Sequence, residues 1–234
     1  MPTLMITGAN RGLGLGLTGA FLADGWKVIA LARRRSPELG ALECPELEIH
    51  VLDLVDDRGL ADLADQLSDR VIDVLFNNAG RMAHRDSPRK EGGTQGFGHF
   101  DRDLWHEVFD INLFTPMALA ERFAENLARS PRGRIVTMTS TLGSMASNTR
   151  GGLYAYRASK AGVNAITKSM AIDLAERNII AVALHPGWVR TDMGGSRAPV
   201  DVETSVDGMK RVVENLRPED SGKVLAYDGS ELPW

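Results

Sequence analysis

The chain has 234 residues, 43% of them hydrophobic and 25% charged, which suits a folded protein with a large core. Its 27 basic and 31 acidic residues give a formal net charge of -4, so no excess of positive charge favours binding to nucleic acid or an anionic membrane. The single cysteine, Cys44, excludes an internal disulfide and a multi-cysteine metal site. Without a basic, apolar leader or a membrane-length apolar stretch, the sequence predicts one cytoplasmic domain over residues 1–234.

Seven short apolar runs, rich in β-branched residues, alternate with amphipathic segments. The runs predict strands at 3–7, 27–32, 47–52, 71–76, 134–139, 179–185 and 223–228. The amphipathic segments predict helices at 14–25, 58–69, 104–128, 154–177 and 202–216. Most of the strands are apolar throughout, as in a parallel sheet covered on both faces. The pattern therefore predicts an α/β Rossmann fold, a doubly wound parallel sheet of about seven strands flanked by helices.

Two long polar segments, 81–103 and 190–202, interrupt this alternation. The first follows the fourth predicted strand and the second follows the sixth. In an open parallel sheet the loops at the carboxyl ends of the strands surround the ligand, so we expect both segments to line the rim of a site. A surface loop without function is the alternative for either.

Two overlapping glycine patterns follow the first strand: Gly8, Gly12 and Gly14 in TGANRGLG, and Gly14, Gly16 and Gly19 in GLGLTG. Because the strand ends directly before Gly8, the first set must make the turn into the helix. There Gly12 would let the backbone approach a pyrophosphate, and Gly14 would allow tight packing. The later glycines would then lie inside the helix and face neighbouring elements. A glycine triplet alone is also compatible with a plain tight turn.

The spacing T-G-x-x-x-G-x-G, which begins at Thr7, resembles the N-terminal signature of the classical short-chain dehydrogenase/reductase family. The extended form of that family would need glycine where this chain has Arg11. Further motifs follow in the family's order: N-N-A-G after the fourth strand, a serine after the fifth, Y-x-x-x-K on the next helix, and HPGWVRTDM after the sixth. The resemblance thus covers nearly the whole chain. Its serine context, its HPGWVRTDMGG segment and its ending, YDGSELPW, are most similar to the sniffer/C-factor carbonyl reductase branch.

This resemblance implies that the chain binds a nicotinamide dinucleotide. In the family an acid at the position of Asp53 lies against the adenine ring, and residues at the positions of Val189 and Thr191 contact the nicotinamide carboxamide and the pyrophosphate. The full set of expected cofactor contacts is Gly8, Asn10, Arg11, Gly12, Leu13, Gly14, Arg33, Asp53, Leu54, Asn78, Ala79, Gly80, Tyr156, Lys160, Pro186, Gly187, Val189 and Thr191.

The end of the second strand bears on the choice between the two nicotinamide cofactors. Family members that prefer NAD(H) carry an acid there for the ribose 2′-hydroxyl, whereas this chain has Ala32 followed by Arg33. A guanidinium can stack on adenine and pair with a 2′-phosphate, and Arg11 would approach the same phosphate. We therefore expect NADP(H) rather than NAD(H). Arg34 and Arg35 are expected in solvent, although either could replace Arg33.

Tyr156 and Lys160 lie four residues apart on a predicted helix and therefore project from one face. A nearby ammonium favours a phenolate, so we expect Lys160 to lower the pKa of Tyr156 from about 10 towards neutrality. Tyr156 would then act as general acid for a carbonyl oxygen, or as base in the reverse direction. Tyrosine and lysine at this spacing also occur by chance on solvent-exposed helices.

Two more polar residues complete the expected catalytic set. Ser140, at the end of the fifth strand, can donate a hydrogen bond to a substrate oxygen; its alternative is a loop-initiating serine, and Ser144 is a weaker rival. Asn112 lies mid-helix, where asparagine is a poor helix former. The family uses an asparagine in this N-x-x-x-P context to hold a water in a proton relay to the lysine. A satisfied buried amide is the competing interpretation. His185 is expected to end its strand, and a catalytic base is the alternative for it.

The sequence thus predicts an NADPH-dependent oxidoreductase that reduces a ketone or aldehyde reversibly, without a metal, with a small-molecule carbonyl or alcohol substrate. The alternative is a cofactor-binding signalling or scaffold protein of the C-factor type with little turnover. One departure is the separation of Ser140 from Tyr156, a few residues longer than is commonest in the family. It implies an enlarged loop beside the substrate. Family members are often homodimers or homotetramers, and some in this branch are monomers, so the resemblance leaves the oligomeric state open.

Overall fold

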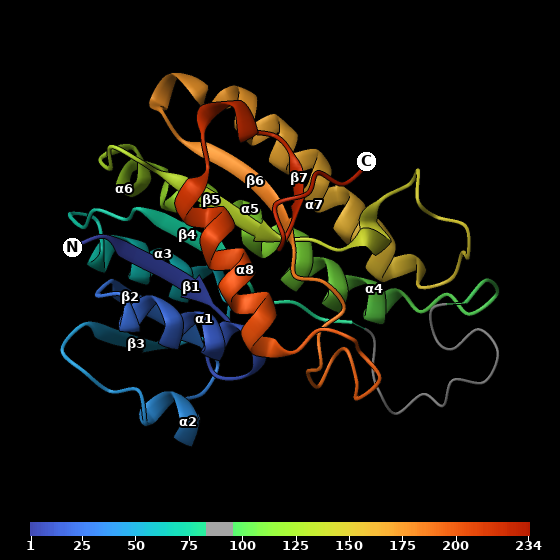
Figure 1. Ribbon diagram of the computed structural model, residues 1–234, viewed down its shortest axis with the longest axis horizontal. Helices are drawn as coiled ribbons and strands as arrows, with labels where there is room; N and C mark the ends of the chain where they lie inside the picture. Colours follow the sequence, from blue (N-terminus) through green and yellow to red (C-terminus); the bar gives the residue numbers. More distant parts are fainter. Residues whose placement is uncertain (83–95) are drawn as a thin grey trace.

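The computed structural model describes residues 1–82 and 96–234, and their strands form one seven-stranded parallel sheet (Figure 1). The central part of the polar segment at 81–103, residues 83–95, lies outside the described residues. The strands are β1 (Thr3–Thr7), β2 (Lys27–Ala32), β3 (Leu47–Val51), β4 (Val74–Asn77), β5 (Arg134–Met138), β6 (Ile180–His185) and β7 (Val224–Ala226). Their order across the sheet is β3-β2-β1-β4-β5-β6-β7. The predicted doubly wound parallel sheet is therefore confirmed.

Helices cover both faces of this sheet. They are α1 (Gly12–Ala23), α2 (Pro37–Gly40), α3 (Asp57–Gln66), α4 (Arg102–Phe109), α5 (Thr115–Arg122), α6 (Ala124–Ala128), α7 (Tyr154–Asp173) and α8 (Val202–Asn215). One core layer packs α1 and α8 against the sheet, and the other packs α3, α5 and α7 against its opposite face (Figure 1). This two-sided burial explains why most strands are apolar throughout.

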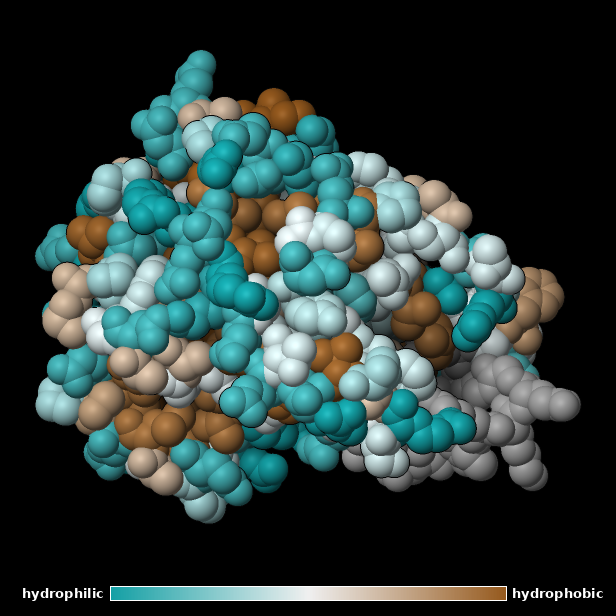
Figure 2. All heavy atoms as spheres, viewed as in Figure 1, coloured by the Kyte–Doolittle hydropathy of each residue, from teal (hydrophilic) through white to brown (hydrophobic). Residues whose placement is uncertain are grey.

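The face that carries α1 and α8 is mainly hydrophilic, with apolar side chains in small separate patches (Figure 2). No helix in residues 1–82 and 96–234 combines the length and apolarity needed to cross a bilayer.

The bounds of several predicted elements differ by a few residues from the structure, and two of the differences have a clear cause. The fourth strand begins at Val74 rather than at residue 71, because the preceding segment bonds elsewhere: the N–H of Ile72 donates to the carbonyl of Asn126 in α6. The helix predicted over 104–128 is divided, and a π-helical turn at Asp110–Phe114 separates α4 from α5. Pro116 at the start of α5 has no N–H to donate to the carbonyl of Asn112, which explains the local change of winding.

The glycine loop adopts the geometry that its first pattern predicts. Gly8 has φ +68° and makes the turn directly after β1. A Cβ on Gly14 would lie 2.2 Å from the carbonyl oxygen of Gly8, so only glycine allows this approach of α1 to the turn. Gly16 instead faces Val206 of α8, where a Cβ would lie 2.9 Å from a methyl group, and Gly19 faces Leu42. The second glycine pattern therefore serves helix packing.

Substitutions of two glycines in α1 should have opposite effects on stability. Gly14→Ala should destabilise by about 1–3 kcal/mol because the new methyl group meets backbone atoms that cannot move aside. Gly19→Ala should stabilise by about 0.5–1 kcal/mol, because its Cβ would meet atoms no nearer than 3.9 Å and alanine is the better helix former. Urea unfolding of the cofactor-free variants measures both, and equal effects of the two substitutions would contradict this account.

Candidate active site

The order of the strands reverses between β1 and β4, and polar groups join the ends of these two strands. The side chain of Asn78, directly after β4, donates to the carbonyl of Thr7 at 2.8 Å and to that of Gly8 at 3.4 Å. The N–H of Ala79 donates to the hydroxyl of Thr7 at 2.9 Å. The N-N-A-G motif thus fixes the glycine turn from the neighbouring strand, at the point where open α/β sheets bind their ligands.

The N-terminus of α1 has the features of an anion site. Its N-cap residue, Arg11, makes no side-chain capping bond, and no acidic residue lies in the first turn. The first N–H groups of the helix therefore have no side-chain partner there, and the helix dipole favours a negative group beside them. Gly12 is exposed with φ +55°, so its backbone is open to a close approach. The carbonyl of Asn10 is held by the hydroxyl of Ser36 at 2.7 Å.

The segment after β6 lies over this glycine loop. A Cβ on Gly12 would lie 3.8 Å from a methyl group of Thr191, and Arg11 forms an ion pair with Asp192 at 2.9 Å. Gly187 makes the turn at φ +87°, and the hydroxyl of Ser205 holds the carbonyl of Pro186 at 2.6 Å. The segment at 190–202 therefore reaches the glycine loop, as expected for a rim of the site.

Ser140 follows β5 by two residues and is nearly buried. Its hydroxyl oxygen accepts the N–H of Leu142 at 3.1 Å and shares a hydrogen bond with the phenol of Tyr156. The hydroxyl of Ser144, the alternative serine, instead donates to the carbonyl of Trp234 at 3.1 Å. Only Ser140 of these two thus has a described hydrogen bond with Tyr156.

Tyr156 and Lys160 lie on the buried face of the first turns of α7, as their spacing predicts. The direction expected for the pKa of Tyr156 is wrong. Burial raises the pKa of Tyr156 to about 12, and the hydrogen bond with Ser140 offsets only part of that rise. The ammonium of Lys160 lies 5.8 Å from the tyrosine ring centroid and donates to the carbonyl of Met138 at 2.7 Å. Burial also lowers the pKa of Lys160, to about 8.

Asn112 lies in the π-helical turn, buried, and its amide is engaged by neighbouring groups. Its Oδ1 accepts the N–H of Arg81 at 2.7 Å, and its Nδ2 donates to the carbonyl of Arg81 at 2.9 Å and to the hydroxyl of Ser159 at 3.0 Å. A Cβ on Gly80 would lie 3.5 Å from Oδ1 of Asn112 and 3.8 Å from Nζ of Lys160. The structure therefore gives Asn112 the contacts of a satisfied amide and also places it beside the lysine.

The expected adenosine-side residues lie at the ends of β2 and β3. Ala32 is buried at the end of β2, and the Arg33 side chain after it is exposed. Asp53 is exposed and accepts the N–H of Val55 at 3.3 Å, whereas Leu54 is buried and its carbonyl accepts the hydroxyl of Thr115 at 3.1 Å. Leu13, at the start of α1, packs against the core layer that contains Ala32.

Two polar residues that hold the site escaped the sequence prediction. Ser36 caps α2 and bonds the glycine loop, and Ser159 donates to the carbonyl of Tyr156 at 2.8 Å while it accepts from Asn112. Ser159 belongs to the Y-x-x-x-K motif, so its place one residue before Lys160 was the available signal. Nothing in the local sequence of Ser36 indicates its bond to Asn10, since 26 residues separate them.

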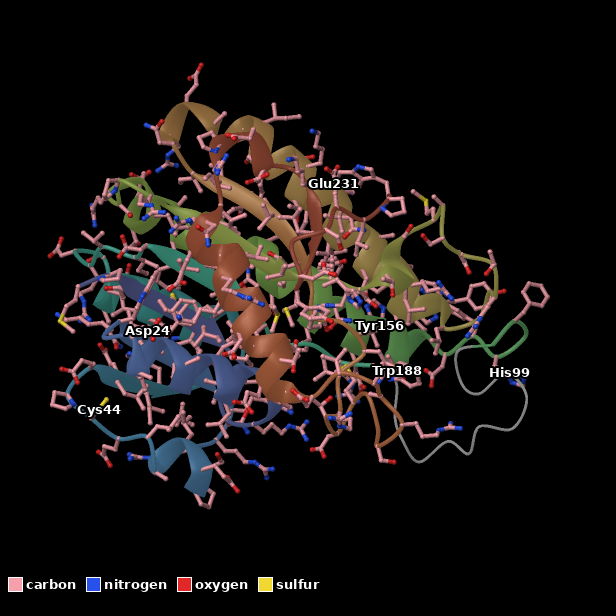
Figure 3. The ribbon with its side chains drawn as sticks, viewed as in Figure 1. Asp24, Cys44, His99, Tyr156, Trp188 and Glu231 are labelled. Atoms are coloured by element: carbon pink, nitrogen blue, oxygen red, sulfur yellow. The ribbon has the colours of Figure 1, made fainter. Side chains whose placement is uncertain are left out.

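His185 ends β6, as predicted, and burial lowers its pKa to about 4. It is therefore neutral at physiological pH. Within residues 1–82 and 96–234, no group of three His, Cys, Asp or Glu side chains has the arrangement to hold a metal ion. Cys44 lies at the edge of the molecule, on the side away from Tyr156 and Trp188 (Figure 3).

Comparison with known proteins agrees with this architecture. Residues 2–201 match the family model described as short chain dehydrogenase. The C-signal protein of Myxococcus xanthus is 40% identical over 163 residues, which cover 70% of this chain and 93% of that protein. The carbonyl reductase Sniffer of D. melanogaster is 34% identical over the whole of both chains, with a TM-score of 0.90. An NADPH-bound carbonyl reductase from chicken fatty liver is 30% identical over 100% of this chain and 99% of that one, with a TM-score of 0.87.

The family model covers residues 2–201, which is most of the chain, and the fold matches that of the Sniffer carbonyl reductase over the whole of both chains. The chain therefore belongs to the short-chain dehydrogenase family of oxidoreductases.

Proposed function

We propose that this protein is an NADP(H)-dependent oxidoreductase that reduces a ketone or an aldehyde to an alcohol, reversibly. The observation that carries the proposal is the hydrogen bond between Ser140 and Tyr156 beside the buried ammonium of Lys160. Similarity to carbonyl reductases, one of them with NADPH bound, supports the same chemistry.

The residues at the glycine loop fit a dinucleotide. The N-terminus of α1 offers N–H groups to a pyrophosphate, and Thr191 lies above Gly12, where a hydroxyl can add a further contact. Asp53 and Leu54 would border the adenine, and Asn78, Ala79 and Gly80 would form the floor beside the ribose. Gly187 and Val189 would flank the nicotinamide. When bound, the reduced nicotinamide supplies a hydride to the substrate carbonyl carbon.

Two arginines would select the phosphorylated cofactor. Arg11 and Arg33 are both exposed, and the glycine loop is bonded to the end of β2, where the N–H groups of Gly8 and Ala9 donate to the carbonyl of Leu31. That strand ends with an alanine, where a carboxylate would repel a 2′-phosphate. The ion pair of Arg11 with Asp192 is exposed and weak, so a phosphate dianion can compete for the guanidinium.

Ser140 and Tyr156 would act on the substrate oxygen. Because the N–H of Leu142 occupies an acceptor site on Ser140, the hydroxyl hydrogen is left to donate towards Tyr156 or a substrate oxygen. That donation stabilises the negative charge that grows on the oxygen as the carbonyl is reduced. Tyr156 then gives its phenol proton to the same oxygen, and takes it back in the oxidation direction.

Lys160 would bind the ribose hydroxyls and, as an ammonium, favour proton release from Tyr156. Asn112 would order a proton relay from the lysine. Both Nδ2 hydrogens of Asn112 are used, but Oδ1 accepts only one described bond, and the absence of a side chain at Gly80 leaves space between Oδ1 and the lysine. A water in that space would accept a hydrogen bond from Lys160 and donate one to Oδ1 of Asn112.

Apolar side chains near the predicted rim favour an apolar or aromatic carbonyl substrate. Phe97, Phe100, Trp188 and Met193 are all exposed. A panel of ketones and aldehydes, followed by the loss of NADPH absorbance, identifies the class that the site prefers.

A cofactor-binding signalling or scaffold protein remains the second candidate because of the identity with C-signal. A binding module has no use for a buried tyrosine hydrogen-bonded to a serine, which favours the enzyme.

Replacing Tyr156 with phenylalanine separates the two candidates. Tyr156→Phe removes the proton donor but keeps the ring, so an enzyme should lose about 100- to 10,000-fold in kcat with little change in NADPH affinity. Stopped-flow or steady-state NADPH oxidation gives kcat, and the quenching of protein fluorescence gives Kd. Undiminished NADPH consumption in this variant would refute the assigned mechanism, and absence of turnover by the unmodified protein across the substrate panel would favour the scaffold.

The pKa values of Tyr156 and Lys160 predict how pH changes the oxidation rate and the affinity for NADPH. With the pKa of Tyr156 raised to about 12, the phenol stays protonated at neutral pH, as reduction requires. Oxidation needs the phenolate of Tyr156, so kcat for oxidation should rise about tenfold per pH unit. The rise should extend from about pH 6 to the pKa that Tyr156 has when cofactor and alcohol are bound. Lys160, with a pKa near 8, loses its charge as the pH rises, so NADPH affinity should fall above about pH 8. A flat oxidation profile over that range would contradict the assignment of Tyr156.

Cofactor choice is tested at the two arginines. Arg11→Ala with Arg33→Asp should lower kcat/KM for NADPH by about 10- to 100-fold for each lost charge-assisted contact, and should shift preference to NADH. Arg211→Ala, an exposed arginine on α8, is the matched control and should change neither value. Comparable kcat/KM for NADH and NADPH in the unmodified protein would refute the expected preference.

A further inference from the structure

The loop between Ser140 and Tyr156, residues 141–153, is held at both of its ends by one side chain. Arg157, the residue after Tyr156 on α7, donates from Nη1 to the carbonyl of Leu142 at 3.2 Å and from Nε to the carbonyl of Gly152 at 3.0 Å. Leu142 lies two residues after Ser140, and Gly152 lies four residues before Tyr156. A single planar guanidinium thus joins the beginning and the end of the enlarged loop.

The contact at Leu142 continues to the hydroxyl of Ser140. The carbonyl of Leu142 accepts from Arg157, while its N–H donates to Oγ of Ser140 at 3.1 Å. The position of this one residue therefore determines where the serine hydroxyl points. With that N–H in place, the serine hydrogen is directed away from Leu142, towards the hydrogen bond with Tyr156.

The contact at Gly152 holds a strained piece of backbone. Gly151, Gly152 and Leu153 have consecutive positive φ angles of +61°, +64° and +52°. Leucine seldom adopts this conformation because its Cβ crowds the backbone, so the strain persists only where surrounding contacts maintain it. Arg157 supplies two of them, since its own N–H also donates to the carbonyl of Leu153 at 2.8 Å.

Within the part of the chain that the structure describes, no carboxylate forms an ion pair with Arg157, and its two side-chain hydrogen bonds there go to carbonyl oxygens of the loop. The side chain is half-buried. Its charge therefore serves the loop, and a lysine, with one point of donation, could not span both carbonyls in the same way.

We propose that Arg157 is a positioning residue that orients the Ser140 hydroxyl towards the reacting oxygen by fixing Leu142 and closing the 141–153 loop. The proposal rests on the proposed function, because it assumes that Ser140 donates to the substrate oxygen. Arg157 itself would touch neither cofactor nor substrate.

The test is a double-mutant cycle between Arg157→Met and Ser140→Ala, measured with NADPH and the best carbonyl substrate of the panel. Arg157→Met keeps the length of the side chain without its donors and should lower kcat by about 10- to 100-fold, with Kd for NADPH within about twofold of the unmodified protein. In the Ser140→Ala background the same substitution should cost less than about twofold, because the group that it orients is already absent. Equal fold losses in the two backgrounds, or no loss in the first, would overturn the proposal.

Two further variants control for general damage. Arg177→Met removes a half-buried guanidinium just beyond the other end of α7, where it pairs with Glu125, and should leave kcat unchanged. Arg157→Lys retains the charge but only one donating nitrogen, so it should give an intermediate kcat, again without additional loss in the Ser140→Ala background. It supplies the same cycle if Arg157→Met does not fold. Full activity in both Ser140→Ala and Tyr156→Phe would refute the proposed function and this inference together. If Tyr156→Phe is inactive but the kcat losses of Arg157→Met and Ser140→Ala multiply in the double mutant, only the role of Arg157 is refuted.

Discussion

All seven strands run parallel, and their order reverses once, between β1 and β4. At a reversal the connections leave the sheet towards opposite faces, so the two strand ends face a space that neither connection covers. Asn78 closes the base of that space by donating to the carbonyls of Thr7 and Gly8. The position of the glycine loop, and through it the start of α1, therefore depends on a bond from the adjacent strand.

Tyr156 and Lys160 lie near the carboxyl ends of the same sheet, and burial determines their pKa values. Tyr156 and Lys160 both lose contact with water, so each moves towards its neutral form: the pKa of the phenol rises to about 12 and that of the ammonium falls to about 8. Hydrogen bonds partly compensate for this loss of water: Lys160 donates to the carbonyl of Met138, and Tyr156 is hydrogen-bonded to Ser140. A buried phenol without competing water suits a donor that must deliver its proton to one oxygen. An anionic cofactor beside the lysine would restore the charge that burial disfavours.

Segments outside the strands hold Tyr156 and its neighbours in position. The π-helical turn aims Asn112 at Arg81 and Ser159, and Ser159 in turn donates to the carbonyl of Tyr156. On the opposite side, the 141–153 loop is joined to α7 by Arg157 and to the C-terminal segment by the bond of Ser144 with Trp234. The region around Tyr156 is thus held on two sides by hydrogen bonds between residues that are distant in sequence.

The sequence alone determined the parallel sheet, five of its seven strands to within one residue at each end, the glycine that turns the chain, and the helical pairing of Tyr156 with Lys160. These follow from local patterns: apolar runs, glycine at a positive φ, and four-residue spacing on a helix. Only the tertiary structure decided what depends on contacts between distant segments. The predicted helix is interrupted at Asn112, and the hydroxyl of Ser144 bonds to the carbonyl of Trp234. The pKa of Tyr156 is raised, where the sequence predicts that it is lowered. A spacing of four residues brings a lysine near a tyrosine, but the loss of water around both groups is set by the packing of the whole sheet edge.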